Sequence, residues 1–231
     1  MPFYEKGTPD LIDLEKQNKE VGNEEPAEEN KPGPALDFFF TLLIAVGIAL
    51  FLNFFIVVNA VIPSASMENT IMTGDRVFGS RLAYKFSEPE RYDIVIFRYP
   101  DDESQLFIKR VIGLPNETVV ISGGKVYIID AGIDTSGTDD EALMEDPGMF
   151  GSAELLDDSF CPEKPVGGGD RDGVFRVPEN SYFVLGDNRN HSNDARFWKN
   201  HYVAEKKILG KAFLKYWPLN EISTLGYKGS R

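Results

Sequence analysis

The hydrophobic pattern divides the chain into one long apolar run and a series of short ones. The long run, residues 38–60 (FFFTLLIAVGIALFLNFFIVVNA), contains no charged side chain. A helix of this length extends about 35 Å at 1.5 Å per residue, enough to cross a hydrocarbon core of about 30 Å. The alternative is a buried helix of a soluble protein, but such a helix is rarely apolar on every face. The pattern therefore predicts a transmembrane helix over residues 37–60.

The segment before this run favours a retained anchor over a cleaved leader. A secretory signal peptide has a short basic start and an apolar stretch of about 7–15 residues. Here residues 1–36 are acidic and rich in Glu, Lys, Asn and Pro, which predicts a disordered tail with little to bury. The basic residues nearest the run are Lys19 and Lys31 upstream and Arg76 downstream, a weak indication that the N-terminus is cytoplasmic.

After residue 61 the hydrophobic runs are short and rich in Val, Ile, Phe and Tyr, with Gly, Pro and Asn between them. These runs are typical of strands, and Ser122-Gly123-Gly124-Lys125 is typical of a hairpin turn. We therefore expect a mainly β fold, with an antiparallel β-sheet body over residues 61–130 and 174–221. One transmembrane helix precedes this body, and residues 222–231 form a C-terminal tail.

Charge separates a further region from the body. The chain has a net charge of −13, and the excess of acid lies in the N-terminal tail and in residues 131–173. We interpret residues 131–173, which are also rich in Gly, Asp and Pro, as a small acidic insertion or cap. The charge argues against binding of nucleic acid. One cysteine, Cys161, excludes an intramolecular disulfide, and with only two histidines we expect neither a metal site nor a cofactor.

Two short elements carry candidate chemistry. Ser64 and Ser66 lie in a Pro-Ser-Ala-Ser turn directly after the apolar run. Taken alone, this segment can be interpreted as a juxtamembrane turn that its serines cap, without a catalytic role. Strand alternation places Lys109 on an apolar face with Phe107 and Val111. Either this lysine snorkels to the sheet edge, or burial lowers its pKa and the neutral amine serves as a general base. Lowering the pKa from about 10.4 to about 8 would raise the neutral fraction at pH 7 from about 0.04% to about 10%.

Five segments that follow one another along the chain carry a resemblance to a known family. They are Pro63-Ser64-Ala65-Ser66-Met67, Gly74-Asp75, residues 91–97 (RYDIVIF), residues 107–115 (FIKRVIGLP), and Gly186-Asp187-Asn188-Arg189 with Ser192, Asp194 and Arg196. In this order they resemble the motif set of bacterial type I signal peptidases, the leader peptidase family. The resemblance covers about residues 38–130 and 174–218. It implies a membrane-bound serine endopeptidase with a Ser/Lys dyad that removes N-terminal signal peptides from secreted preproteins.

The resemblance also implies roles for the reacting groups. Ser66 resembles the nucleophile and Lys109 the general base, an alternative to the serine–histidine triad. The side chain of Ser64 and the backbone N–H of Ser66 resemble an oxyanion hole. The family pattern predicts a shallow apolar pocket that accepts small substrate side chains such as Ala, lined by Ile62, Ile71 and Ile108.

Supporting roles follow from the same resemblance. Ser192 resembles the hydroxyl that orients the lysine amine, and Asp194 with Arg196 resembles the ion pair behind it. Asp187 resembles the carboxylate that pairs with the arginine after the catalytic lysine, here Arg110.

The implied setting is the cell membrane. A single-pass chain would have its N-terminus in the cytoplasm and its catalytic domain on the extracytoplasmic face. The implied partners are secretory preproteins with small residues at the cleavage site and the lipid bilayer, with the secretion translocon as a further candidate.

The chain departs from the family pattern at several positions, and other interpretations stay open. Ala65 replaces a frequent Gly, Asn69 a common Pro, Asn190-His191 the usual Asp-Asn, and Ala195 a frequent Ser. A triad of Ser66, His191 and Asp194 is a rival mechanism. A self-cleaving repressor of the serine–lysine class is a rival protease, although such proteins are soluble and bind DNA. The alternative function is a catalytically dispensable signal-peptidase-like chaperone or assembly protein at the membrane.

Overall fold

The computed structural model describes residues 33–166 and 171–226. The chain divides into two compact units, residues 1–48 and 49–231, and each is described by itself. Of the tail predicted to be disordered, residues 1–36, the first 32 lie outside the described residues. Its last predicted residues already belong to the helix that begins at Pro34.

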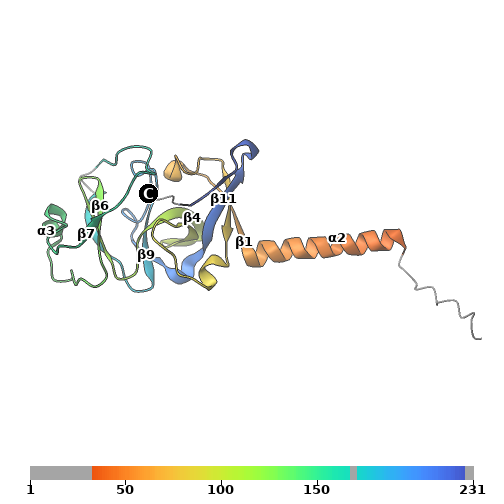
Figure 1. The fold of residues 1–231 in the computed structure, drawn as a ribbon, viewed down its shortest axis with the longest axis horizontal. Coiled ribbons are helices and arrows are strands. Elements are labelled where there is room, and N and C mark those ends of the chain that lie inside the picture. Colours follow the sequence, from red (N-terminus) through yellow and green to blue (C-terminus); the bar gives the residue numbers. More distant parts are fainter. Residues whose placement is uncertain (1–32, 167–170, 227–231) are drawn as a thin grey trace, which may run out of the picture. The chain divides into compact units, whose positions relative to one another are not determined.

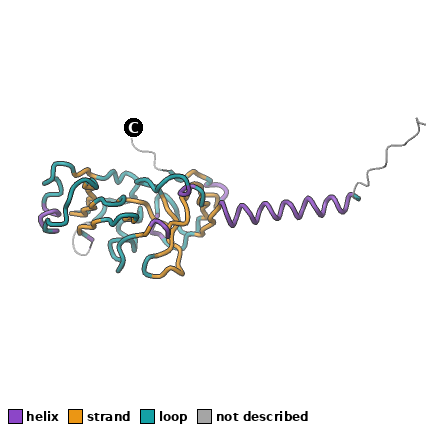
Figure 2. Tube along the Cα trace, turned by 90° about the horizontal axis from the view of Figure 1, so that it is seen from below, coloured by secondary structure: helices purple, strands orange, loops and turns teal. Residues whose placement is uncertain are grey.

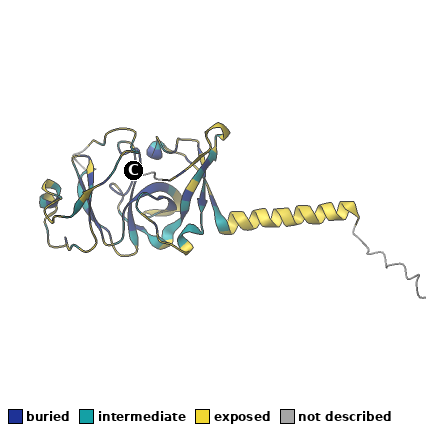
Figure 3. Ribbon diagram, viewed as in Figure 1, coloured by how far each residue is buried: buried dark blue, intermediate teal, exposed yellow. Residues whose placement is uncertain are grey.

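The long apolar run forms a helix, as predicted. α2 (Pro34–Phe51) continues into the π-helical turn η1 (Leu52–Ile56), and no residue of either is buried (Figures 1 and 3). In the part of the chain that the structure describes, this is the one helix long and apolar enough to cross a membrane. The predicted end at residue 60 is wrong. Residues 57–60 belong to strand β1 (Val57–Val61), because their backbone groups pair with a neighbouring strand.

The larger sheet of the second unit contains eight strands, all paired antiparallel. Figure 2 draws the strands in orange. In spatial order they are β1, β2 (Arg76–Ser80), β11 (Ile208–Trp217), β3 (Ile94–Tyr99), β4 (Asp102–Gly113), β9 (Ser181–Leu185) and β10 (Val203–Ala204), with β12 (Ser223–Thr224) beside β11. The segment predicted as a C-terminal tail therefore contributes β12 to the sheet.

The smaller sheet contains four strands, in the order β7 (Ala153–Leu155), β6 (Lys125–Ile129), β5 (Thr118–Ser122) and β8 (Gly173–Arg176). The predicted hairpin joins β5 to β6, and its two central glycines have φ of +57° and +78°, a conformation that favours glycine. The acidic insertion supplies β7 and the short helix α3 (Asp140–Glu145). Leu143 and Leu156 of the insertion are buried, so the insertion packs into the fold and is not only a solvated loop.

Four 3-10 turns complete the described elements: η2 (Ala65–Met67), η3 (Ala83–Lys85), η5 (Glu205–Lys207) and η6 (Leu219–Glu221).

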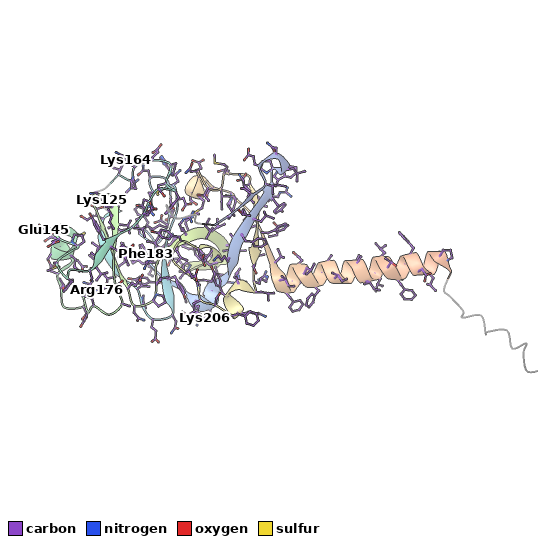
Figure 4. The ribbon with its side chains drawn as sticks, viewed as in Figure 1. Lys125, Glu145, Lys164, Arg176, Phe183 and Lys206 are labelled. Atoms are coloured by element: carbon purple, nitrogen blue, oxygen red, sulfur yellow. The ribbon has the colours of Figure 1, made fainter. Side chains whose placement is uncertain are left out.

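Apolar side chains cover both faces of the large sheet. Along β3, Val95 and Phe97 join one buried cluster, and Ile94 and Ile96 join another. Phe183, which belongs to the first cluster, is labelled in Figure 4. A strand buried on both faces explains the uninterrupted run IVIF. The prediction of a mainly β, antiparallel fold with one preceding apolar helix is confirmed.

Candidate active site

Ser66 lies in a tight turn directly after β1. The turn η2 places Ser64 in an extended conformation, and the Glu68 N–H donates to the Ala65 carbonyl at 3.1 Å. Met67 is fully buried in the apolar cluster that also contains Ile62, which anchors the turn to the core. As a result the Ser66 side chain is held in place and largely shielded from water.

Lys109 lies in β4, where its backbone pairs with Val95 of β3. From this position its side chain reaches Ser66. Its Nζ donates to Ser66 Oγ at 2.7 Å and to the Ile108 carbonyl at 3.1 Å. The lysine is only 4% exposed, so the alternative in which it snorkels to the sheet edge is wrong. The structure therefore joins the two side chains that the sequence singled out, although they lie 43 residues apart.

Burial changes the acid–base chemistry of this lysine. Removal of the ammonium from water lowers the pKa of Lys109 from 10.5 to about 8, although the carboxylates of Asp194 and Asp187 act in the opposite direction. At pH 7 roughly a tenth of the amine is then neutral. A neutral amine in hydrogen-bond contact with a hydroxyl can accept its proton.

The Ser64 hydroxyl lies beside the same group. It donates to Ser66 Oγ at 3.4 Å, a long contact, and the residue is exposed. Its hydroxyl can turn toward another acceptor at small cost, because a bond of this length is weak.

The first predicted ion pair, Arg110 with Asp187, is present and buried. Arg110 Nε and an Nη donate to the two carboxylate oxygens of Asp187 at 2.8 and 2.6 Å. Sequence reasoning missed Thr70, whose hydroxyl donates to the same carboxylate at 2.5 Å. Nothing in the sequence around Thr70 distinguishes it from an ordinary turn residue.

The second predicted ion pair, Asp194 with Arg196, is buried as well. Arg196 donates to the carboxylate at 2.8 and 2.9 Å, and the Gly186 N–H donates to it at 3.0 Å. The loop that carries both residues packs tightly on the serine turn, since the Asn188 N–H donates to the Ser66 carbonyl at 3.1 Å. A Cβ on Gly186 would lie 2.5 Å from the Ser66 carbonyl oxygen, so only glycine fits there.

Ser192 lies in the same loop, packed against Gly186. Its Oγ is buried and, among the described residues, has no hydrogen-bond partner. The predicted contact between this hydroxyl and the lysine amine is therefore not made in this conformation.

A cavity of about 540 Å³ opens beside the serine and lysine. Ile62 and Ile108 line it, as predicted, whereas Ile71 is fully buried in the apolar cluster that contains both. The sequence did not identify the remaining apolar wall, which includes Ala60, Val61, Ile96, Leu106 and Phe107. His191 and Asn193 contribute polar groups to the lining.

In the described part of the chain, no three His, Cys, Asp or Glu side chains come together as metal ligands. The chemistry available at the site is that of a hydroxyl activated by a shielded amine next to an apolar cavity. This arrangement suits a hydrolase that forms an ester between its serine and an acyl group of the substrate.

Comparisons with known proteins agree with this class. The family model described as "Signal peptidase, peptidase S26" matches residues 35–217. A probable signal peptidase I-2 of Synechocystis is 32% identical over 80% of this chain and 74% of its own length. A signal peptidase I of Leptolyngbya laminosa is 34% identical over 84% and 85%, and one of Pseudomonas fluorescens is 31% identical over 94% and 81%.

The chain therefore belongs to the signal peptidase family, peptidase S26. It is a signal peptidase, an enzyme whose substrates are preproteins that carry signal peptides. The family is anchored in membranes, and the one long apolar helix found among the described residues fits one span. The five segments predicted membership of this family, and that prediction is confirmed.

Proposed function

We propose that the chain is a membrane-bound serine endopeptidase in which Ser66 is the nucleophile and neutral Lys109 is the general base. The observation that carries this proposal is the 2.7 Å hydrogen bond between the buried Lys109 Nζ and Ser66 Oγ. The lowered pKa of Lys109 supports it, because the neutral amine is then available near neutral pH.

The reaction would proceed in two steps. In the first, Lys109 takes the proton of Ser66 as the hydroxyl oxygen attacks the scissile carbonyl, and then gives this proton to the leaving amine. In the second, Lys109 takes a proton from a water molecule as the water oxygen attacks the ester carbonyl carbon. Lys109 returns this proton to Ser66 Oγ as the ester bond breaks, which releases the signal peptide with a new carboxylate. The Ser66 N–H and the Ser64 hydroxyl would stabilise the oxyanion in both steps, which requires Ser64 to turn from its present weak contact.

The neighbouring polar groups would hold the lysine in place. The pairs Arg110–Asp187 and Asp194–Arg196 fix the strand and the loop on either side of the amine. Ser192, whose buried hydroxyl lacks a partner among the described residues, would orient the amine once Ser66 is acylated.

The cavity supports a preference for small substrate side chains. Ile62 and Ile108 border it next to Ser66, and Ala60 and Ile96 line it as well. We infer that two inward-pointing side chains of an extended signal peptide occupy it, and that small residues such as Ala are preferred at both. A buried charge without a partner there would be costly, so charged residues would be excluded.

The proposed topology places the N-terminus in the cytoplasm and the catalytic unit on the extracytoplasmic face. Preproteins emerging from the secretion translocon would be the substrates there, and the lipid bilayer would hold α2. Weakly favourable charges near the span support this orientation.

The test is cleavage of a preprotein with Ala-X-Ala before its cleavage site by the full chain in detergent micelles. We expect cleavage by the wild-type chain and none by Ser66→Ala or Lys109→Ala, with Lys125→Ala as a control of equal charge change on an exposed lysine (Figure 4). Cleavage retained by either active-site variant would overturn the mechanism. A membrane function preserved in both variants in cells would support the chaperone alternative instead.

A further inference from the structure

A short part of the acidic insertion, residues 157–161, contacts the catalytic loop. We call residues 157–161 the docking segment. Asp158 accepts two hydrogen bonds from the guanidinium of Arg189, at 2.7 and 3.0 Å. The Arg189 side chain is 2% exposed, and its Nε also donates to the Gly186 carbonyl at 3.2 Å. A guanidinium buried to this degree depends on its carboxylate partner, because an unpaired buried charge is strongly destabilising.

Phe160 extends the contact to the strand that carries the lysine. Its ring centroid lies 4.3 Å from Cζ of Arg110 and 5.7 Å from Cζ of Arg189. Since Arg110 directly follows Lys109 and pairs with Asp187, the ring covers one face of the ion pair behind the active site.

The turn after Ser66 meets the docking segment as well. Asn69 Nδ2 donates to the Phe160 carbonyl at 2.9 Å. Asn69 has φ of +78°, which asparagine tolerates and which the ring of proline, common at this place in the family, does not allow. The departure from the family pattern at this position therefore coincides with a contact to the insertion.

The docking segment thus contacts all three elements of the site, but none of its residues lines the substrate cavity. We propose that the docking segment positions the catalytic loop and the Ser66–Lys109 pair for the reaction, with Asp158 as its principal positioning residue. The inference rests on the proposed function and adds a role for the insertion, which the family resemblance does not cover.

Cys161 provides a built-in probe of docking, because it is the only cysteine of the chain. Burial raises the pKa of its thiol to about 12, so the docked thiol is protonated and unreactive at neutral pH. Release of the docking segment would expose the thiol and speed its reaction with an aromatic disulfide reagent.

The experiment compares Asp158→Asn with Glu154→Gln, which removes the same charge at an exposed site of the insertion. For the full chain in micelles we measure kcat and KM on the preprotein, the rate of Cys161 labelling, and the melting temperature. Asp158→Asn should lower kcat about tenfold or more, change KM by less than about twofold, and accelerate labelling. Glu154→Gln should change none of these. Asp158→Glu, which keeps the carboxylate, should restore most of kcat and slow labelling again.

Fast labelling of Asp158→Asn with an unchanged kcat would overturn the inference, since the site would then work without the docked segment. Unchanged labelling would overturn it as well, because Asp158 would not hold the segment. If Asp158→Asn does not fold, the same two outcomes are measured with Asn69→Gly, which removes the hydrogen bond to the Phe160 carbonyl and tolerates the positive φ at this position. A wild-type chain that fails to cleave the preprotein would contradict the proposed function itself, and the labelling rates would still report on docking.

Discussion

Replacing Lys109 with methionine is expected to abolish cleavage and to stabilise the fold. Methionine has a similar length and no charge, so it can occupy the same buried space between Phe107 and Ser66. The wild-type lysine is costly to bury because it must shed either its water or its proton on folding. If Lys109 has the role in the reaction that we propose, its removal therefore relieves a cost in stability.

The magnitude follows from the pKa of the lysine. The change in pKa from 10.5 to about 8 corresponds to a cost of about 3 kcal/mol at pH 7. The variant loses the hydrogen bond to Ser66 Oγ, worth about 1 kcal/mol. The net gain is about 2 kcal/mol, which for a chain of this size raises the melting temperature by about 4–8 °C.

The stability cost of burying Lys109 should decrease as pH rises. Below pH 8 the folded chain must bury a protonated amine, or release a proton that the unfolded chain retains, so the cost is fully present there. Between pH 8 and 10.5 the folded amine is neutral while the unfolded lysine still holds its proton. The cost is then that of removing this proton, and it falls by about 1.36 kcal/mol per pH unit until it disappears above pH 10.5. The difference in melting temperature between Lys109→Met and the wild type should therefore be largest at pH 7 and below, and small near pH 10.

Thermal unfolding of both full chains in detergent micelles, followed by circular dichroism from pH 6 to 10, measures this difference. Lys125→Met is the matched control, because Lys125 is exposed and should give no such pH-dependent gain. A Lys109→Met variant that is less stable at pH 7, or a difference that does not shrink at high pH, would refute the reasoning that burial lowers the pKa of Lys109.

Three further substitutions test the surrounding groups. Ser64→Ala should lower kcat about 10²–10³-fold with little change in KM, measured by single-turnover cleavage; an equal loss in substrate binding would contradict its role at the oxyanion. Asp187→Asn leaves Arg110 buried without its counter-charge and should lower the free energy of unfolding by about 3–5 kcal/mol in urea denaturation, whereas a change below about 1 kcal/mol would count against the pair. His191→Ala should retain most of the activity, and its loss would favour the triad.

Much of the fold could be predicted because local patterns carry it. The run IVIF of β3 and the Gly123-Gly124 hairpin specify strands and a turn within a few residues. The end of the helix could not be predicted from hydropathy, since Val57 and Val58 suit lipid and a buried strand equally well. Pairing with β2, some twenty residues away in sequence, decides the matter.

The candidate site also combines residues that could be predicted from the sequence with residues that could not. The placements of Ser66 after an apolar run and of Lys109 on an apolar strand left other interpretations open. The resemblance of five ordered segments to a known family singled these two residues out. The partner of Arg189 could not be predicted, because an acidic, Gly-rich segment indicates solvated carboxylates, and only the tertiary fold brings Asp158 to a buried guanidinium. The cavity wall is a similar case, as packing places Ala60 in the lining and Ile71 in the core.

The most direct test of the central claim is the pH dependence of kcat/KM for preprotein cleavage by the full wild-type chain, since this quantity reports the ionisation of groups in the free enzyme. We predict that kcat/KM rises with a single ionisation near pH 8 and levels off above it, as the neutral form of Lys109 becomes dominant. A profile that is already flat at pH 7, or one that rises near the ordinary pKa of histidine, about 6.5, would contradict a neutral Lys109 as the base.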